Sequence, residues 1–563
     1  MENVYVGIDL GTTTTLIASA KSEDNIRVLD IIQEDKDGEI YEASYLKSLA
    51  YFPDKQPPFV GTRAEFYGQQ DASRFVRAVK RQMGRRILLP VVEKEPYQVS
   101  ALYLEKALHT AKRKLSGEMV FTVTVPASFT SNQRADTLRA LKEACENTGV
   151  PFPKDTNEIF ISEPVAAALA FLHEDFHKKQ AFQKLDYTKD VQRIIIYDIG
   201  GGTTDLTLIY IAPRKDSVQE ITDLQIRVEE ISYYNPFGGE DFDLKIAEFI
   251  YYEFLKQNPG LEKLELNSTE RLSLRLQFSA IAKDLKERLS NNFNSHQVSD
   301  NPFAEDDEDN TTVTSKFTGT IRLRGQTYNC SGEMSWEQLR QCVYPLLHTD
   351  NRRGVIAPLR SLLAKRRFSV NEIDGLLLVG GMARFPLIEE VLKGEFGESK
   401  VWVFQPPDHA VVRGAALYSY FRTSAAQFTL EEPASDAYYV KRKEKGFDLI
   451  LPSQKRTGEK KKYVLDRDAE TLVIQVFSGE EAQDGEEESM YHTLIYQGGV
   501  TLHLGKQYPK GTPVWVRVAY DENLSGGQSH SKLPWLFVWI NDENGEPQKI
   551  HYSEIFNSRE ERS

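Results

Sequence analysis

Two stretches of the chain place aspartates, glycines and threonines where a polyphosphate and a metal ion could bind. In residues 194–209 (IIIYDIGGGTTDLTLI), an apolar run ends at Asp198, three glycines follow, and Asp205 precedes a second apolar run. Glycines in a turn let backbone N–H groups approach an anion closely, and threonine hydroxyls add donors. Two carboxylates beside such a turn suit a hydrated Mg²⁺ ion. The stretch therefore predicts a strand–turn–strand clamp for polyphosphate and metal.

The N-terminal stretch repeats this order of residues. Residues 4–17 (VYVGIDLGTTTTLI) contain an apolar run, Asp9, a turn at Gly11, threonines at Thr12 and Thr13, and a second apolar run. One such hairpin alone is best interpreted as an ordinary glycine-turned pair of core strands. Two copies indicate an internal repeat, and two hairpins that face each other would hold a phosphate chain from both sides.

Length and composition restrict the class of protein. A chain of 563 residues is too long for one core, so we expect three or four domain-sized units. The net charge of −14 argues against nucleic-acid binding, which needs a basic surface. Three scattered cysteines fit a reducing compartment, and no apolar run approaches the ~20 residues of a membrane span. We therefore expect a cytoplasmic protein without nucleic-acid or membrane partners.

The elements that must position these residues alternate between strands and helices, which predicts an α/β fold. Residues 159–171 predict a strand and an Ala-rich helix, with Glu163 and Pro164 at the junction. Glu163 could be a structural charge at the helix N-terminus or could point into a ligand cleft. Residues 373–384 predict a strand that ends in a double glycine before a helix, a generic device for nucleotide approach.

Two further segments have different patterns. Apolar residues at helical spacing predict a helix over residues 75–86, which contains Lys80. We expect the arginines of this helix to form a solvated basic face: Arg77, Arg81, Arg85 and Arg86.

Helical periodicity ends near residue 428, where residues 428–436 predict a linker. Short alternating runs between turn residues then predict a separate all-β unit.

An ordered set of motifs resembles a known family. GIDLGTTTT, TVTVPASF, ISEPVAAALAF, IYDIGGGTTDLTL, FGGEDFD and LLLVGGMARFP resemble the ATPase domain of the seventy-kilodalton heat-shock chaperones (DnaK type) over residues 3–422. Actin and sugar kinases share the two hairpins, whereas SEPVAAA and GGEDFD are typical of the chaperone branch. The resemblance implies an α/β fold with a two-lobed actin-like ATPase domain over 1–425, a linker over 426–437, a smaller β-sandwich substrate-binding-like domain over 438–553 and a charged tail over 554–563.

The resemblance also implies cofactors and residue roles. ATP or ADP would bind with Mg²⁺, and K⁺ is a further candidate ion; Asp9, Asp198 and Asp205 would arrange the metal and its waters. Catalysis would depend on Lys80, Glu163, Asp198 and Thr203. The phosphates would be held by Gly11, Thr12, Thr13, Gly201, Gly202 and Thr203. The rest of the nucleotide would contact Gly239, Lys286, Ser290, Gly381, Arg384 and, near the hinge, Asp408. Two residues match the family's switch pair between nucleotide and interdomain surface: Pro126 and Arg134.

The sequence departs from the family pattern at several positions. Thr14 and Met382 replace the residues usual beside the threonines and the double glycine, and Glu287 stands where the family has an arginine that stacks on adenine. The segment FTLEEPASD has one leucine, so we do not expect this linker to dock as an apolar strand. The sandwich is shortened around residues 438–452, and the chain after Tyr552 is too short for the family's helical lid.

Three functions are compatible with these patterns. The first is an ATP-hydrolysing, chaperone-like protein whose nucleotide state controls the binding of unfolded or extended polypeptide. Its candidate partners include a J-domain co-chaperone and a nucleotide exchange factor. The second is a nucleotide-gated scaffold that binds one dedicated protein partner. The third, a small-molecule kinase, shares the hairpins, but the chain has no evident sugar-binding segment.

Overall fold

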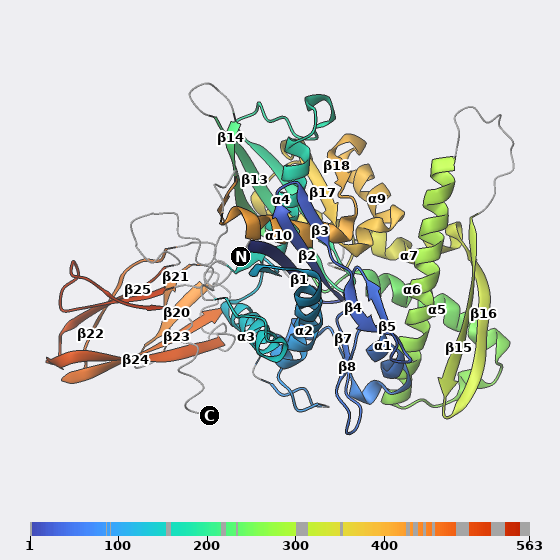
Figure 1. The fold of residues 1–563 in the computed structure, drawn as a ribbon, viewed down its shortest axis with the longest axis horizontal. Helices are drawn as coiled ribbons and strands as arrows, with labels where there is room; N and C mark the ends of the chain where they lie inside the picture. Colours follow the sequence, from blue (N-terminus) through green and yellow to red (C-terminus); the bar gives the residue numbers. More distant parts are fainter. Residues whose placement is uncertain are drawn as a thin grey trace.

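Two lobes form the larger part of the protein, and a smaller β-rich part lies beside the first lobe in the computed structural model (Figure 1). Each lobe is organised around one sheet. The structure describes residues 3–85, 87–90, 92–153, 159–215, 221–231, 235–299, 313–349, 353–423, 428–431, 437–442, 446–452, 457–479, 495–519 and 535–551.

The sheet of lobe I has the strand order β11-β10-β1-β2-β3, and β6 pairs with β2. β1 and β2 form an antiparallel hairpin, and β10 and β11 extend it in parallel on the side of β1. The strands are β1 (Asn3–Leu10), β2 (Thr14–Ser22), β3 (Asn25–Val28), β6 (Leu46–Lys47), β10 (Glu118–Val125) and β11 (Phe160–Ser162).

The sheet of lobe II has the strand order β18-β17-β12-β13-β14-β19. Here β12 and β13 form the antiparallel hairpin, and β17 and β18 extend it in parallel on the side of β12. Both sheets therefore have one plan, which confirms the internal repeat predicted from the two glycine turns. The strands are β12 (Gln192–Ile199), β13 (Thr204–Lys215), β14 (Ile221–Ile231), β17 (Gly375–Val379), β18 (Val401–Val403) and β19 (Phe428–Glu431).

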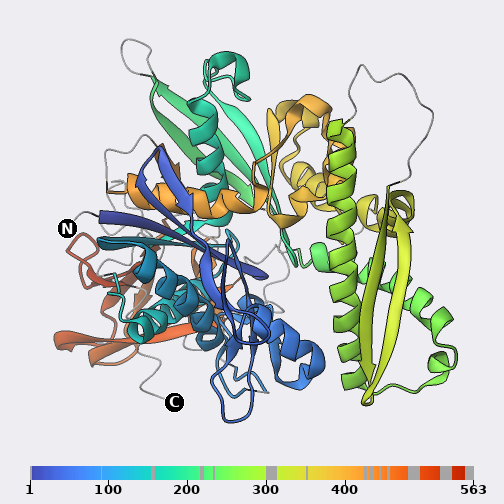
Figure 2. The same cartoon turned by 45° about the vertical axis from the view of Figure 1, so that its right-hand side comes forward.

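Helices cover these sheets, and in lobe II the long α6 packs beside α5 and the β15–β16 hairpin (Figure 2). No helix in the described part of the chain is long and apolar enough to cross a membrane. The helices are α1 (Thr62–Gln70), α2 (Pro96–Lys114), α3 (Ser131–Thr148), α4 (Glu163–Phe176), α5 (Gly239–Gln257), α6 (Ser268–Ser299), α7 (Trp336–Leu347), α8 (Ile356–Arg366), α9 (Pro386–Phe396) and α10 (Ala410–Phe421). Further strands complete the lobes: β4 (Ile31–Glu34), β5 (Ile40–Ala43), β7 (Leu49–Tyr51), β8 (Phe59–Val60), β9 (Phe75–Arg77), β15 (Thr314–Leu323) and β16 (Gln326–Ser335).

Two helices cross between the lobes. α4 follows β11 of lobe I but packs on β12 of lobe II, whereas α10 follows β18 of lobe II but packs on β1 and β2 of lobe I. The two helices touch where Gly414 faces Ala166, because a Cβ atom on Gly414 would overlap the Ala166 carbonyl oxygen. The chain therefore joins the lobes through one tightly packed crossing.

The helix predicted over residues 75–86 is not formed. Phe75–Arg77 is the strand β9, which pairs with β7, and Val79–Gln82 is a short 3-10 turn. Ala78 separates them with a left-handed φ of 51°, a backbone conformation that no helix continues through. The prediction was wrong because pairing with a strand earlier in the chain overrides the local helical spacing.

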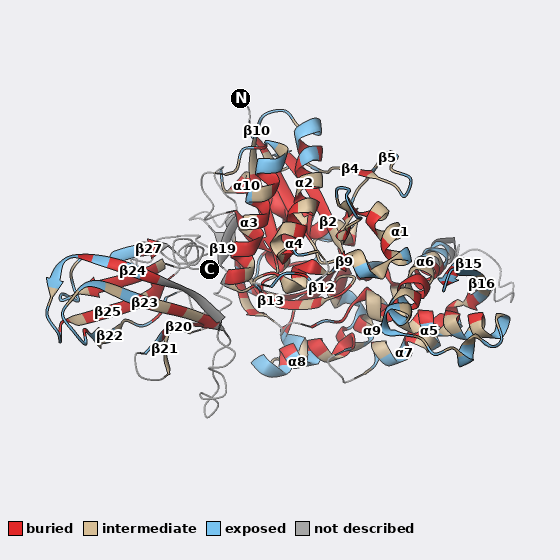
Figure 3. Ribbon diagram, turned by 90° about the horizontal axis from the view of Figure 1, so that it is seen from below, coloured by how far each residue is buried: buried red, intermediate tan, exposed pale blue. Residues whose placement is uncertain are grey.

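Two four-stranded sheets follow the lobes, with orders β21-β20-β23-β24 and β22-β25-β26-β27. Buried apolar residues from both sheets, such as Tyr438 and Val516, belong to one cluster, and Ala135 of α3 belongs to it as well. Lobe I and this β unit therefore share a packed contact, and buried residues lie inside both (Figure 3). The strands are β20 (Ala437–Lys441), β21 (Phe447–Leu451), β22 (Lys461–Val464), β23 (Ala469–Gly479), β24 (Ile495–Tyr508), β25 (Pro513–Ala519), β26 (Trp535–Ile540) and β27 (Gln548–His551).

Part of the predicted linker is a strand. Of residues 426–437 the structure describes 428–431 and 437, and the predicted tail 554–563 lies outside the described residues. Residues 428–431 form β19, which pairs in parallel with Leu224–Arg227 of β14. The expectation that this segment would not dock as a strand is therefore wrong. Backbone N–H and C=O groups make the pairing, and these do not require a run of leucines.

Candidate functional site

The two glycine turns lie against each other between the lobes. A Cβ atom on Gly201 would lie only 2.6 Å from Thr13 Oγ1, so a side chain there would force the turns apart. The start of α5 packs against the second turn. The backbone N–H of Gly239 donates to the carbonyl oxygen of Gly200 (3.0 Å), and that of Glu240 donates to the carbonyl oxygen of Gly201 (2.6 Å). Glycine at these positions therefore lets three backbone segments meet.

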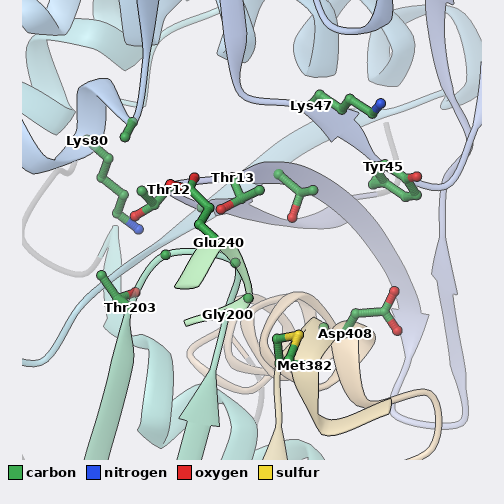
Figure 4. Close-up of a pocket in the computed structure, with 18 of the residues that line it drawn as sticks. Thr12, Thr13, Tyr45, Lys47, Lys80, Gly200, Thr203, Glu240, Met382 and Asp408 are labelled. Carbon is green, nitrogen blue, oxygen red and sulfur yellow. The ribbon is translucent and has the colours of Figure 1, made fainter. Parts of the chain in front are cut away.

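A cavity of about 1210 Å³ opens at this meeting point. In Figure 4, Lys80 and Thr203 lie near Thr12 at one end, and Met382 lies near Asp408 at the other. Every residue predicted for a catalytic, nucleotide-binding or metal-binding role lines this cavity: Asp9, Gly11, Thr12, Thr13, Lys80, Glu163, Asp198, Gly201, Gly202, Thr203, Asp205, Gly239, Lys286, Ser290, Gly381, Arg384 and Asp408. Of the predicted switch pair, Pro126 lines it and Arg134 does not.

One end of the cavity holds a buried group of charges. Lys80 is 5% exposed and forms an ion pair with Glu163, the first residue of α4. Its ammonium group also lies 5.5 Å from the ring centre of Phe129. Asp9, at the end of β1, accepts a 2.7 Å hydrogen bond from Thr124 Oγ1 on the neighbouring strand β10. One cation and two carboxyl groups thus lie in one buried place at this end of the cavity.

Burial changes the charge state of the aspartates. It raises the pKa of Asp9 to about 6 and that of Asp205 to about 7, and the negative charge of Glu163 adds to both shifts. The pKa of Asp198 is raised well above its usual value by burial and then by the other carboxylates. Lys80 lowers the pKa of all three aspartates, but it does not offset burial.

These carboxylates fit a hydrated cation. Among the described residues, no three His, Cys, Asp or Glu side chains form a group that could hold a metal ion by themselves. Mg²⁺ commonly keeps several waters and binds through one or two carboxylates together with substrate phosphates. A divalent cation beside Asp9, Asp198 and Asp205 would favour their ionised forms, so the residues present fit Mg²⁺ that is shared with a phosphate ligand.

We expect the Asp205→Asn variant to gain stability relative to the natural chain as the pH rises. Asp205 holds a proton up to a pKa of about 7 in the folded protein, against 3.8 for an ordinary aspartate. The folded state therefore binds more protons between these values, and its free energy of unfolding falls as the pH rises through them. Urea unfolding of both ligand-free chains at about pH 5.5 and about pH 7.5 measures this difference. An equal change with pH in both chains would contradict the prediction.

Polar groups at the other end of the cavity are paired with one another. Lys286 Nζ lies 2.7 Å from Asp243 Oδ1 and 3.3 Å from Met382 Sδ. Ser290 Oγ donates a 2.7 Å hydrogen bond to the Lys286 carbonyl oxygen one turn earlier in α6. Lys286 therefore has a fixed position at the wall of the cavity.

Two predicted site residues and one residue that departs from the family pattern also line this end of the cavity. Arg384 and Asp408 form an ion pair at 2.5 Å, which joins the segment after β17 to the turn before α10. Glu287, which departs from the family pattern, lines the same cavity and lies 3.9 Å from Lys283. The cavity wall here carries both signs of charge.

The sequence analysis missed contacts that cross between the lobes. Arg81 donates to the carbonyl oxygen of Gly202, and Arg77 forms an ion pair with Glu240 at 2.7 Å. The prediction of a solvated face is therefore wrong for Arg81, whose partner lies on the other lobe, whereas Arg77 and Arg85 are exposed as predicted. Arg81 directly follows the predicted catalytic Lys80, but its acceptor is a backbone carbonyl oxygen, which leaves no signal in the sequence. Arg86 lies outside the described residues.

Comparison of the sequence with known proteins identifies its family. A family model described as Hsp70 protein matches residues 93–482, more than half of the chain. The chain belongs to the Hsp70 family. Its similarity to curated Hsp70 relatives is distant: it is 29% identical to the chaperone protein DnaK of Thermosipho melanesiensis over 416 residues. It is 27% identical to DnaK of Thermosipho africanus over 416 residues and of Thermotoga neapolitana over 417.

Each of these matches covers 73% of the chain and 58% of the relative's length. The resemblance stated from the motifs is therefore confirmed, as is the divergence of this Hsp70 chain. Family membership and the two α/β lobes fit an actin-like ATPase domain.

Proposed function

We propose that this Hsp70-family chain binds ATP with Mg²⁺ between its lobes and hydrolyses it to ADP and phosphate. The observation that carries the proposal is the single cavity that collects both glycine turns, the three aspartates, Lys80 and Glu163. Phosphoryl transfer needs little beyond positioning and neutralisation of charge, and these groups supply both. DnaK relatives are chaperones by their names, which supports the same class of activity.

The proposed roles follow from the geometry. The turns at Gly11–Thr13 and Gly200–Thr203 would hold the phosphates through backbone N–H groups and threonine hydroxyls. Bound Mg²⁺ would neutralise charge that develops on the phosphates. Glu163 would hold the attacking water by accepting its hydrogen bond, and Lys80, through its ion pair with Glu163, would keep that carboxylate aligned. Lys286, Ser290 and Arg384 would contact the nucleoside.

We further propose that the nucleotide state controls polypeptide binding by a β-sandwich formed by the two four-stranded sheets over residues 438–553. Two features support this coupling. β19 pairs with β14 of lobe II, so the segment before the β unit is held by the ATPase part. Ala135 of α3 packs into the apolar cluster of the β unit. The same proposal includes a J-domain co-chaperone and a nucleotide exchange factor as partners, and a cytoplasmic location for the protein.

We expect extended apolar peptides to accelerate hydrolysis in a single turnover of ATP by the whole chain, because substrate at the β unit would alter the contacts at β19 and α3. The measurement uses a panel of such peptides, with scrambled charged peptides as controls for ionic effects. Acceleration of about threefold or more would support polypeptide-gated hydrolysis. Hydrolysis that is indifferent to every peptide would contradict it and favour the alternative, a nucleotide-gated scaffold for one dedicated protein partner.

A further inference from the structure

The turn that carries Lys80 rests on α3. This turn, Val79–Gln82, is followed by Gly84, whose φ is +78°. A Cβ atom on Gly84 would lie 2.8 Å from Gln133 Cγ and 3.0 Å from the Gln133 backbone nitrogen. Glycine therefore allows both the left-handed conformation and the close approach to the first turn of the helix.

A buried carboxylate makes the polar contact at this place. The backbone N–H of Gly84 donates a 2.7 Å hydrogen bond to Asp136 Oδ2, and Asp136 is 4% exposed. The other oxygen, Oδ1, lies 3.3 Å from Arg139 on the next turn of α3. Burial raises the pKa of Asp136, whereas the bonds from Gly84 and Arg139 lower it. A buried carboxylate is costly unless such donors satisfy it, which indicates that the Gly84 contact is a fixed part of the site.

The residues next to Asp136 in α3 contact both the surroundings of Lys80 and the β unit. Arg134 Nε donates a 3.3 Å hydrogen bond to the carbonyl oxygen of Phe129, whose ring lies beside the Lys80 ammonium group. Ala135 belongs to the apolar cluster of the β unit. One turn of α3 thus contacts the β unit on one side and the Lys80 segment on the other.

We propose that Asp136 is a positioning residue that holds the Lys80 turn against α3, at the place where α3 contacts the β unit. The inference rests on the proposed hydrolysis of ATP and adds a residue to it. Asp136 acts through Gly84: loss of its carboxylate releases the Gly84 N–H, and Lys80 then loses its fixed distance from Glu163. A shift of α3 caused by the β unit would reach Lys80 by the same bond.

The test compares three variants of the full chain. Asp136→Ala removes the acceptor, Asp136→Asn keeps a carbonyl oxygen that can accept from Gly84, and Arg139→Ala removes the ion pair but leaves the Gly84 bond. We expect single-turnover hydrolysis to fall about tenfold in Asp136→Ala with little change in ATP affinity, because a small misplacement of a catalytic group is costly. Asp136→Asn and Arg139→Ala should stay within about threefold of the natural chain.

Hydrogen exchange in residues 79–85 gives a readout that does not depend on activity. We expect Asp136→Ala to exchange about tenfold faster there, while Arg139→Ala does not. Equal effects of Asp136→Ala and Arg139→Ala on both readouts, or unchanged exchange in Asp136→Ala, would overturn the inference and leave Asp136 as a support of α3 alone. If the natural chain itself does not hydrolyse ATP, the proposed function fails, and the exchange measurement still decides whether Asp136 holds the turn.

Discussion

Replacing Lys80 with Ala will lower single-turnover hydrolysis of ATP by about 100-fold or more, the size of effect seen when one preorganised charge is removed from an active site. Lys80 is the buried cation paired with Glu163, and it lowers the pKa of Asp9, Asp198 and Asp205. Its loss leaves four carboxyl groups without that cation. The aspartates will then take up protons at higher pH, which weakens their hold on Mg²⁺.

The pH profile separates this cause from a loss of folding. In the Lys80→Ala chain, the pH at which Mg²⁺-dependent nucleotide binding is half-maximal should move upward, because the raised aspartate pKa values rise further without the lysine. The matched control is Lys106→Ala, since Lys106 also forms a lysine–glutamate ion pair, with Glu34 at 3.2 Å, but on the surface of lobe I. A loss of less than about tenfold, or an equal loss in the control, would contradict the role proposed for Lys80.

Replacing Gly414 with Ala will destabilise the protein by about 3 kcal/mol, at the upper end of the usual cost of overpacking. Gly414 lies in α10, and its missing Cβ gives room to the carbonyl oxygen of Ala166 in α4. Backbone cannot move aside as a flexible side chain can. The added methyl group must therefore separate the two helices that join the lobes.

The matched control is Gly394→Ala, because Gly394 is also inside a helix but a Cβ there meets nothing within 4 Å. Alanine at that position should stabilise the chain by about 0.5–1 kcal/mol through helix propensity. Thermal and urea unfolding of both variants, followed by circular dichroism, compares them. Equal midpoints for Gly414→Ala and the natural chain would show that the helix crossing is not tightly packed in solution.

The sequence predicted those parts of the fold that are formed by contacts between residues close together in the chain. The two hairpins were predictable because β-branched runs and glycine turns determine a strand–turn–strand unit within about 16 residues. The turn at Val79–Gln82 was not, because β9 pairs with β7 from an earlier part of the chain. The same holds for β19, whose partner strand β14 lies about two hundred residues before it.

The sequence predicted which residue types form the candidate site, but it did not predict their hydrogen-bond partners. Aspartate, glycine and threonine in one order pointed to phosphate and metal, and the structure brings them to one cavity. The role of Arg81 was not predictable, because its acceptor is a carbonyl oxygen of the other lobe. Nor was Asp136, whose partner is a backbone N–H that leaves no sign in the sequence.

The pairing of β19 with β14 also protects a vulnerable edge. While β19 is in place, the outward N–H and C=O groups of Leu224–Arg227 are hydrogen-bonded. Were this segment to leave, β14 would become the last strand of its sheet and present those groups to any extended chain nearby, its own or another molecule's. Release of β19 would thus leave an unpaired sheet edge that can bind another strand. Molecules in which β19 stays undocked for long would self-associate more readily than molecules in which it is docked.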